Sequence, residues 1–399
     1  MTRRLKCIAL TVLMMTVLSS VWADERPTRE NPASDFDPAH ARWIGAISRA
    51  DSGLPVGDRS QHVPSPQEKA GREQWEKVPD IAKRSILLRK SVRTVKAVER
   101  AVLSVVGLGH YELYIDGVNQ CGLPSGAVFQ PHWSDYDKTV YYNRYDISET
   151  FRGTPGEHVF GVCLGNGFYN VSGNRYLKLK VTFGPPTLLF QLNLTYTDGT
   201  TETYCSDESW KWHESPITFN CIFGGEDYDA RLEQPGWCKA GFDDSRWKPV
   251  VVQEPPLGRL TRQTAPPVQI MQTYPAKSVK DVGNDTKVFD MGQNLSGFPT
   301  VTVQGRPGQT IRLVPGESLN ADGTVNQKRT GSPHYYEYTI GSDRPETWRP
   351  SFSYYGYQYI QVQGADYLTG DGNHPVILDL VSNFVYNSAE EVGTFECSN

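Results

Sequence analysis

The sequence predicts an all-β protein in which two antiparallel β-sandwich domains, jelly-roll-like in type, follow a signal peptide. In residues 101–117, apolar side chains occupy every second position on both sides of a glycine-marked break, the pattern of strands that bury one face. Asp116-Gly117 and Asp198-Gly199 follow such runs and are strong hairpin signals. The 36 glycines and 27 prolines suit short strands with tight turns, and no long segment has helical periodicity.

The length and charge of the chain limit the classes of protein to consider. At 399 residues it is long enough for two or three domains, because single hydrophobic cores stop growing well below that size. The 40 basic and 45 acidic residues give a net charge of −5, so no basic surface is expected for nucleic acid or an anionic membrane. We therefore expect neither as a partner.

The N-terminus reads as a targeting segment. Arg3, Arg4 and Lys6 precede an apolar run at 8–18, and small residues end the stretch 1–23, as in a secretory signal peptide. No later segment is long and apolar enough to span a membrane. The polar, proline-containing stretch 24–40 is predicted to be a flexible leader. The sequence thus predicts an exported protein, periplasmic or extracellular.

The first sandwich is predicted at 41–253. Order is expected from Trp43 onward, with a long surface excursion at 51–80. Short runs rich in β-branched and aromatic residues are the expected strands. They lie at 86–88, 140–147, 159–164, 190–196 and 201–205.

A proline-rich stretch, 254–276, is expected to be a linker and cannot be a central strand, because proline lacks the ladder donor. The second sandwich is predicted at 277–388, and 389–399 is expected to begin a further domain. The strands of this second sandwich are again short runs bounded by turn residues. They lie at 301–303, 311–313, 335–340, 357–362 and 377–384.

Eight motifs occur in the order found in one known family. Five lie in the first predicted domain: GHYELYIDG (109–117), PHWSDYDKTVYY (131–142), LGNGFY (164–169), GEDYDAR (225–231) and FDDSRW (242–247). Three lie in the second: FDMGQNLSGF (289–298), GESLNADGTVN (316–326) and WRPSFSYYGYQYIQVQG (348–364). Together they resemble the two N-terminal β domains of bacterial α-L-rhamnosidases of glycoside hydrolase family 78, over residues 43–399.

The resemblance implies an activity but no catalytic residue in this chain. Members of this family hydrolyse terminal α-L-rhamnose with inversion, using acids carried by an α-helical toroid that follows the two β domains. Since the chain ends where that toroid would begin, we assign no catalytic residue and expect scaffolding of the toroid, with L-rhamnose-containing glycans as ligands. The alternatives are a free-standing carbohydrate-binding protein without hydrolytic activity and a cell-surface interaction module.

Two motifs offer groups that hold sugars elsewhere. In LGNGFY, the flanking glycines allow Asn166 to project from a turn beside Tyr169, and PHWSDYDKT adds Trp133 and Tyr136 as stacking surfaces. The alternative is that these residues shape turns or pack in the core.

The resemblance also implies a cation, because in some members the first β domain binds rhamnose through calcium. Calcium prefers carboxylate, amide and carbonyl oxygens, and no other cofactor is required. The nearest candidate ligands are Asp116, Asn166, Asp135 and Asp137.

The acids of GEDYDAR are interpreted as structural; the alternatives are a contact with the missing toroid or its substrate, and catalysis. In a strand, Glu226 faces away from Asp227 and Asp229, and Arg231 shares the face of those two aspartates. A neighbouring guanidinium lowers the pKa of a carboxyl, the opposite of what a general acid needs. In FDMGQNLSGF we likewise expect a strand with a bulge, in which Gln293 satisfies a buried carbonyl.

The cysteines are interpreted as structural or simply buried. Six remain once the signal peptide is removed, and their spacing does not select among the 15 pairings. The absence of a C-x-x-C pair disfavours a thiolate metal site or a redox motif.

Overall fold

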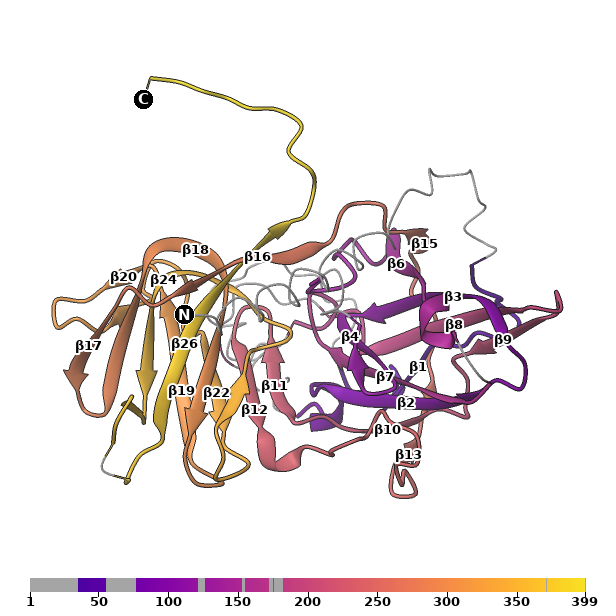
Figure 1. Cartoon of the computed structure of the whole chain (residues 1–399), viewed down its shortest axis with the longest axis horizontal. Helices are drawn as coiled ribbons and strands as arrows, with labels where there is room; N and C mark the ends of the chain where they lie inside the picture. Colours follow the sequence, from indigo (N-terminus) through magenta and orange to yellow (C-terminus); the bar gives the residue numbers. More distant parts are fainter. Residues whose placement is uncertain are drawn as a thin grey trace, which may run out of the picture.

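The computed structural model describes residues 35–54, 77–120, 126–152, 155–171, 175, 182–370 and 372–398. The signal peptide, most of the leader, the centre of the excursion at 51–80 and Cys121 lie outside these ranges. Strands dominate the described chain, beside short 3-10 turns such as Asp80–Ala82 and Ser148–Phe151, so the all-β prediction is confirmed. Figure 1 shows two β bodies side by side. No helix within the described ranges is long and apolar enough to cross a bilayer.

The first body is a sandwich of two sheets that enclose one apolar core. Its first sheet has β9 (Thr201–Cys205) beside β8 and otherwise runs β14 (Val251–Val252), β1 (Ile44–Gly45), β8 (Thr187–Tyr196), β3 (Val98–Leu108), β6 (Thr139–Asp146), β15 (Arg259–Arg262). The second sheet runs β13 (Lys248–Pro249), β10 (Lys211–Glu214), β2 (Ile86–Arg93), β7 (Glu157–Gly165), β4 (His110–Ile115), β5 (Val118–Asn119). Fully buried Leu103, Phe190 and Phe160 show that both sheets contribute to the core.

The stretch 101–117 forms two strands, but they belong to different sheets: β3 pairs with β6 and β8, whereas β4 pairs with β7 and β5. Gly109 makes the corner with φ +104°, and a Cβ there would lie 2.0 Å from the carbonyl oxygen of Gly165. Only glycine fits so close an approach of two backbones. The predicted hairpins at Asp116-Gly117 and Asp198-Gly199 are confirmed, joining β4 to β5 and β8 to β9.

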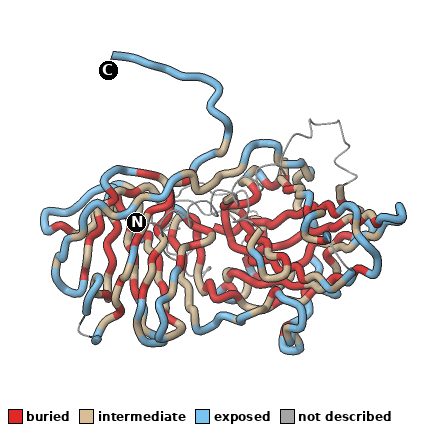
Figure 2. Tube along the Cα trace, viewed as in Figure 1, coloured by how far each residue is buried: buried red, intermediate tan, exposed pale blue. Residues whose placement is uncertain are grey.

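The second body is one large sheet that folds over itself. Its order is β11 (Ile217–Cys221), β12 (Gly225–Asp229), β22 (Tyr335–Thr339), β19 (Thr310–Gly316), β24 (Tyr355–Gln363), β18 (Thr286–Gln304), β26 (Val376–Asn387), β16 (Val268–Pro275). Three strands branch from it, β17 (Ser278–Gly283), β23 (Glu346–Trp348) and β25 (Asp366–Tyr367), and β20 (Ser318–Leu319) pairs with β21 (Val325–Asn326). The first half of β18 pairs with β24 and the second half with β26. This one strand therefore runs from one layer of the folded sheet into the other. Figure 2 shows the resulting buried interior in both bodies.

The bend in β18 coincides with FDMGQNLSGF. The pairing register shifts between Asp290 and Leu295, which confirms the predicted bulge. A Cβ on Gly297 would lie 1.8 Å from the carbonyl oxygen of Asn383, so glycine is needed for close packing of the strands. Gln293 is exposed, however, and its predicted role toward a buried carbonyl is wrong.

The predicted boundary between the domains needs correction. The stretch 254–276 contains two strands: β15 pairs in parallel with β6, and β16 pairs antiparallel with β26. Four of the five prolines, at 255, 256, 266 and 267, lie outside both strands, and Pro275 is the last residue of β16, which is an edge strand. Conversely, β11 and β12 fall inside the range predicted for the first sandwich but join the sheet of the second, through parallel pairing of β12 with β22. The strands are otherwise mostly antiparallel.

Order also begins before Trp43, contrary to prediction. Phe36 is buried and packs edge-on against Tyr142, with ring centroids 5.3 Å apart. Asp35 accepts a 2.5 Å hydrogen bond from the Tyr142 hydroxyl. The end of the predicted flexible leader therefore covers part of the first sheet.

Three of the described cysteines, Cys163, Cys221 and Cys238, are buried, as predicted. Cys163 and Cys238 carry free thiols, and so does half-buried Cys205. Burial raises the pKa of Cys163 well above its ordinary value, so this thiol behaves as a small apolar group.

Candidate functional site

Asn166, the central residue of the predicted sugar site, lies in the interior rather than on a surface turn. Its side chain has no exposed area. Nδ2 donates to the carbonyl oxygens of Lys83 (2.6 Å) and Asn220 (3.0 Å), and Oδ1 accepts from Asn170 (2.9 Å). The amide thus cross-links segments that are distant in the sequence, and its polar atoms already have protein partners.

The three predicted aromatic residues divide into core and surface. Tyr136 and Tyr169 are buried and meet edge-on, with centroids 5.1 Å apart. Burial raises the pKa of Tyr169 to about 12. Trp133 is instead 62% exposed and stacks on Phe168 at 5.0 Å. It alone among these three offers an aromatic face to a ligand.

The predicted calcium ligands do not form one site. Asp116 sits in the turn after β4 with φ +52°, accepts from the backbone N–H of Val159 at 2.7 Å and lies 2.8 Å from Nδ1 of His158. Because β7 runs from beside Asp116 to Asn166, about seven residues and roughly 20 Å separate these two side chains, too far for one ion.

The other two predicted ligands lie together before β6. Asp135 accepts from the N–H of Asp137 at 3.2 Å and pairs with Lys138 at 2.9 Å. Within the described ranges, no three His, Cys, Asp or Glu side chains converge as a metal site would require.

The acids of GEDYDAR have structural partners. The predicted ion pair between Asp229 and Arg231 is confirmed at 2.7 Å, and hydrogen bonding from Arg231 lowers the pKa of Asp229. Asp227 pairs with Arg175 rather than Arg231, at 2.6 Å. The expected lowering of its pKa is wrong, because burial outweighs the guanidinium and raises it.

Glu226 ties β12 to the turn before β24, and both belong to the second body. Its carboxyl oxygens accept from the backbone N–H groups of Ser351 and Phe352, both at 2.9 Å, and the side chain has no exposed area. Burial raises the pKa of Glu226 to about 8. A raised pKa is a property of general acids, but a carboxyl without access to solvent cannot reach a substrate.

A pocket of about 450 Å³ lies between the sandwiches and is lined by two further acids, Glu112 and Glu233. Glu112 accepts from the Tyr114 hydroxyl at 2.7 Å and pairs with Arg349 at 3.2 Å. Glu233 accepts from the hydroxyl of Tyr228 at 2.7 Å. Each carboxylate therefore has a local structural partner, and neither has the surroundings of a general acid.

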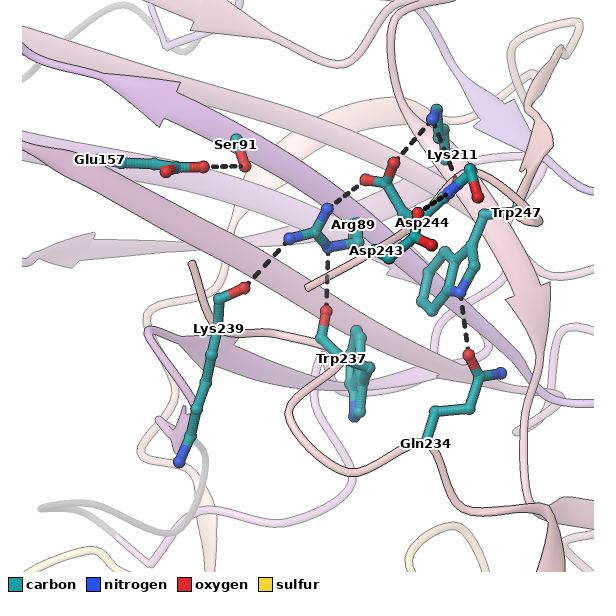
Figure 3. A network of polar contacts seen from close by, with 11 residues as sticks. Arg89, Ser91, Glu157, Lys211, Gln234, Trp237, Lys239, Asp243, Asp244 and Trp247 are labelled. Carbon is teal, nitrogen blue, oxygen red and sulfur yellow. Dashed lines mark hydrogen bonds and ion pairs between the residues drawn. The ribbon is translucent and has the colours of Figure 1, made fainter. Parts of the chain in front are cut away.

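Residues 234–239 line this pocket, and they belong to the segment 234–247, which is held in place by Arg89 (Figure 3). Arg89 is 5% exposed and donates to the carbonyl oxygens of Trp237 (2.9 Å) and Lys239 (3.1 Å) and to the carboxylate of Asp244. Lys211 binds the other oxygen of Asp244 at 2.7 Å. Burial opposes ionisation of Asp244, but the bonds from Lys211 and Arg89 prevail and lower its pKa. In the sequence, Arg89 stands inside the apolar run ILLRKSV (86–92). A charged residue in a buried strand needs a partner of opposite charge, so this position was the signal that could have revealed Asp244.

A second hollow, of about 540 Å³, lies at the seam between the sandwiches on the side of β16 and β26. Trp133 and Phe168 line it from the first body, and Tyr354 and Tyr386 from the second. The sequence alone does not predict this hollow, because its walls come from segments far apart in the chain.

Comparison with known proteins identifies the family. Residues 96–272 match the family model described as the alpha-L-rhamnosidase N-terminal domain, and residues 280–377 match that of the bacterial alpha-L-rhamnosidase concanavalin-like domain. An alpha-L-rhamnosidase of Formosa agariphila is 32% identical over 321 residues, which are 78% of this chain and 32% of the relative. One from Streptomyces avermitilis is 34% identical over 298 residues, or 74% of this chain and 28% of the relative.

Solved structures agree with these matches. The alpha-L-rhamnosidase of Dictyoglumus thermophilum has a TM-score of 0.72 and 31% identity, covering 90% of this chain and 37% of that one. The Streptomyces avermitilis enzyme complexed with L-rhamnose has a TM-score of 0.69 and 31% identity, covering 78% and 29%. This chain spans about a third of the length of its curated relatives. It belongs to the α-L-rhamnosidase family, of which it carries the N-terminal domain and the concanavalin-like domain.

Proposed function

We propose that this chain supplies the non-catalytic β portion of an exported α-L-rhamnosidase, which hydrolyses terminal α-L-rhamnose from glycans or glycosides with inversion. The observation that carries the proposal is the ordered match of both β domains to rhamnosidases about three times as long. In this role the two sandwiches brace and position a catalytic helical toroid.

The surroundings of the acids support a scaffold rather than a catalyst. Inversion needs two carboxyl groups about 6.5 to 9.5 Å apart, with a water between one of them and the sugar. Asp227, Asp229, Glu112 and Glu233 bind arginine or tyrosine partners, and Glu226 is fully buried. We therefore place the reacting acids outside these two sandwiches.

The test is hydrolysis of p-nitrophenyl α-L-rhamnoside. The purified chain should release no p-nitrophenol, whereas a protein translated from the same gene together with any downstream helical region should do so. Turnover by the 399-residue chain alone would refute the scaffold role. Export is tested separately, by N-terminal sequencing of the mature protein, which should begin near Asp24.

The second candidate is a carbohydrate-binding protein without hydrolytic activity, and the exposed ring of Trp133 favours it. Calorimetric titration with L-rhamnose, with and without calcium, separates the candidates when combined with the hydrolysis assay. Binding with no hydrolysis from any form of the gene product would favour this second function. A flat isotherm in both conditions would exclude it.

A further inference from the structure

The seam hollow has the chemistry of a binding site for an uncharged ring. Its aromatic walls include Trp133, which is 62% exposed, together with Tyr386 at 43% and Tyr354 at 37%. Large apolar side chains exposed together in one concave place mark a binding surface more strongly than single exposed residues do. The volume of about 540 Å³ is that of a small-molecule site.

The charge of the lining restricts the ligand. Among the described residues around the hollow there is no Asp, Glu, Lys or Arg, and the titratable groups are His110, His132 and tyrosines. Burial lowers the pKa of His110 to about 3 and also lowers that of His132, so both imidazoles are neutral at physiological pH. A phosphate, a carboxylate or a metal ion would find no opposite charge here.

Neutral hydrogen-bonding groups complement the aromatic walls. Nδ1 of His110 and Nε2 of His132 have no hydrogen-bond partner within the described part of the chain. A buried polar atom without a partner costs about 1–3 kcal/mol. Both histidines line the hollow, and the torsion about Cβ–Cγ is broad, so that a small rotation of each ring can present its nitrogen to a ligand hydroxyl. Gln263 and Ser296 add further polar groups.

We propose that the seam hollow binds one neutral sugar ring without calcium, stacking its apolar face on Trp133 and directing its hydroxyls to His132 and His110. This site differs from the calcium site implied by the family resemblance, because its lining contains no carboxylate. It also needs both sandwiches, since Tyr354 and Tyr386 belong to the second. The proposal does not depend on hydrolysis by a longer protein.

The test is calorimetric titration of the full chain with methyl α-L-rhamnoside in the presence of EDTA. We expect saturable binding with a millimolar dissociation constant. Trp133→Ala should weaken binding at least about tenfold, the usual consequence of losing an aromatic stacking surface. Tyr386→Ala, in the part of the lining that the second sandwich supplies, should also weaken it. Leu257→Ala, which removes a 79% exposed side chain outside the hollow, should leave binding unchanged.

Each other outcome overturns the proposal. No saturation in EDTA at sugar concentrations well above the expected millimolar dissociation constant would exclude a neutral-sugar site, and so would binding that requires added calcium. Equal affinity in wild type and Trp133→Ala, with unchanged unfolding midpoints, would place any binding elsewhere. Tighter binding of glucuronate than of the neutral glycoside would contradict the uncharged lining. Because this assay has no hydrolytic readout, its failure leaves the proposed scaffold role intact.

Discussion

Replacing Arg89 by methionine removes the clamp on segment 234–247 while keeping an apolar side chain of similar length. In the wild type, the guanidinium binds the carbonyl oxygens of Trp237 and Lys239 and the carboxylate of Asp244. Methionine cannot donate to any of these acceptors. The segment has little regular structure of its own. These bonds attach it to β2, beside the apolar contacts that Trp237 and Trp247 make in the cluster around Leu87.

The size of the expected stability loss follows from how deeply the ion pair between Arg89 and Asp244 is buried. Breaking a buried ion pair by removing one partner costs about 3–5 kcal/mol. Asp244 is 26% exposed and keeps its bond to Lys211, which compensates part of its charge. We therefore expect the lower end, a loss of about 3 kcal/mol in unfolding free energy, with the two carbonyl groups contributing most of it.

Urea unfolding of the purified chain measures the loss, and hydrogen exchange locates it. Exchange should accelerate in residues 234–247 and stay unchanged in β3 and β8. The matched control is Lys90→Met, the next residue of β2, whose ammonium binds exposed Ser209; it should change stability by less than about 0.5 kcal/mol. A loss below about 1 kcal/mol for Arg89→Met, or uniform acceleration of exchange, would refute the clamp.

Three further substitutions test other parts of the fold by their unfolding midpoints. Asn166→Ala should cost about 2–3 kcal/mol, since it leaves two buried carbonyl groups without their donor; a neutral result would restore a surface role for this residue. Burial raises the folded-state pKa of Glu226 from 4.5 to about 8, so the stability that the protonated carboxyl contributes is lost as the pH rises from 4.5 to 8. Glu226→Gln, which cannot ionise, should flatten the dependence of the unfolding midpoint on pH. Gly109→Ala, with its Cβ 2.0 Å from Gly165, should destabilise the chain far more than Gly199→Ala, where the space is open and only the positive φ opposes the change; equal effects would contradict the close approach.

The strands were predictable because their signals are local. Alternation and turn dipeptides placed β8 and β9 correctly, together with the turn between them. Pairing was not predictable in the same way: β3 and β4 are neighbours in sequence but lie in different sheets. Sequence shows which face of a strand is apolar, but the choice of partner depends on contacts with distant segments.

The same distinction applies to the candidate site. Trp133 was identified from a local motif and is exposed beside the hollow, but the hollow itself depends on β16 and β26. Asn166 was misjudged because a Gly-Asn-Gly turn looks exposed until Asn220 covers it. The partner of Asp227, Arg175, lies 52 residues away, beyond the reach of strand periodicity.

Because of the hairpin of β11 and β12, neither body can be produced alone by cutting the chain at the proline-rich stretch. Although this hairpin lies between strands of the first sandwich in sequence, it forms the outer edge of the large sheet against β22. Severing the polypeptide between residues 253 and 277 would strip β22 of this cover and expose a bare edge, a template for aggregation. Anyone shortening this protein should therefore keep both halves together.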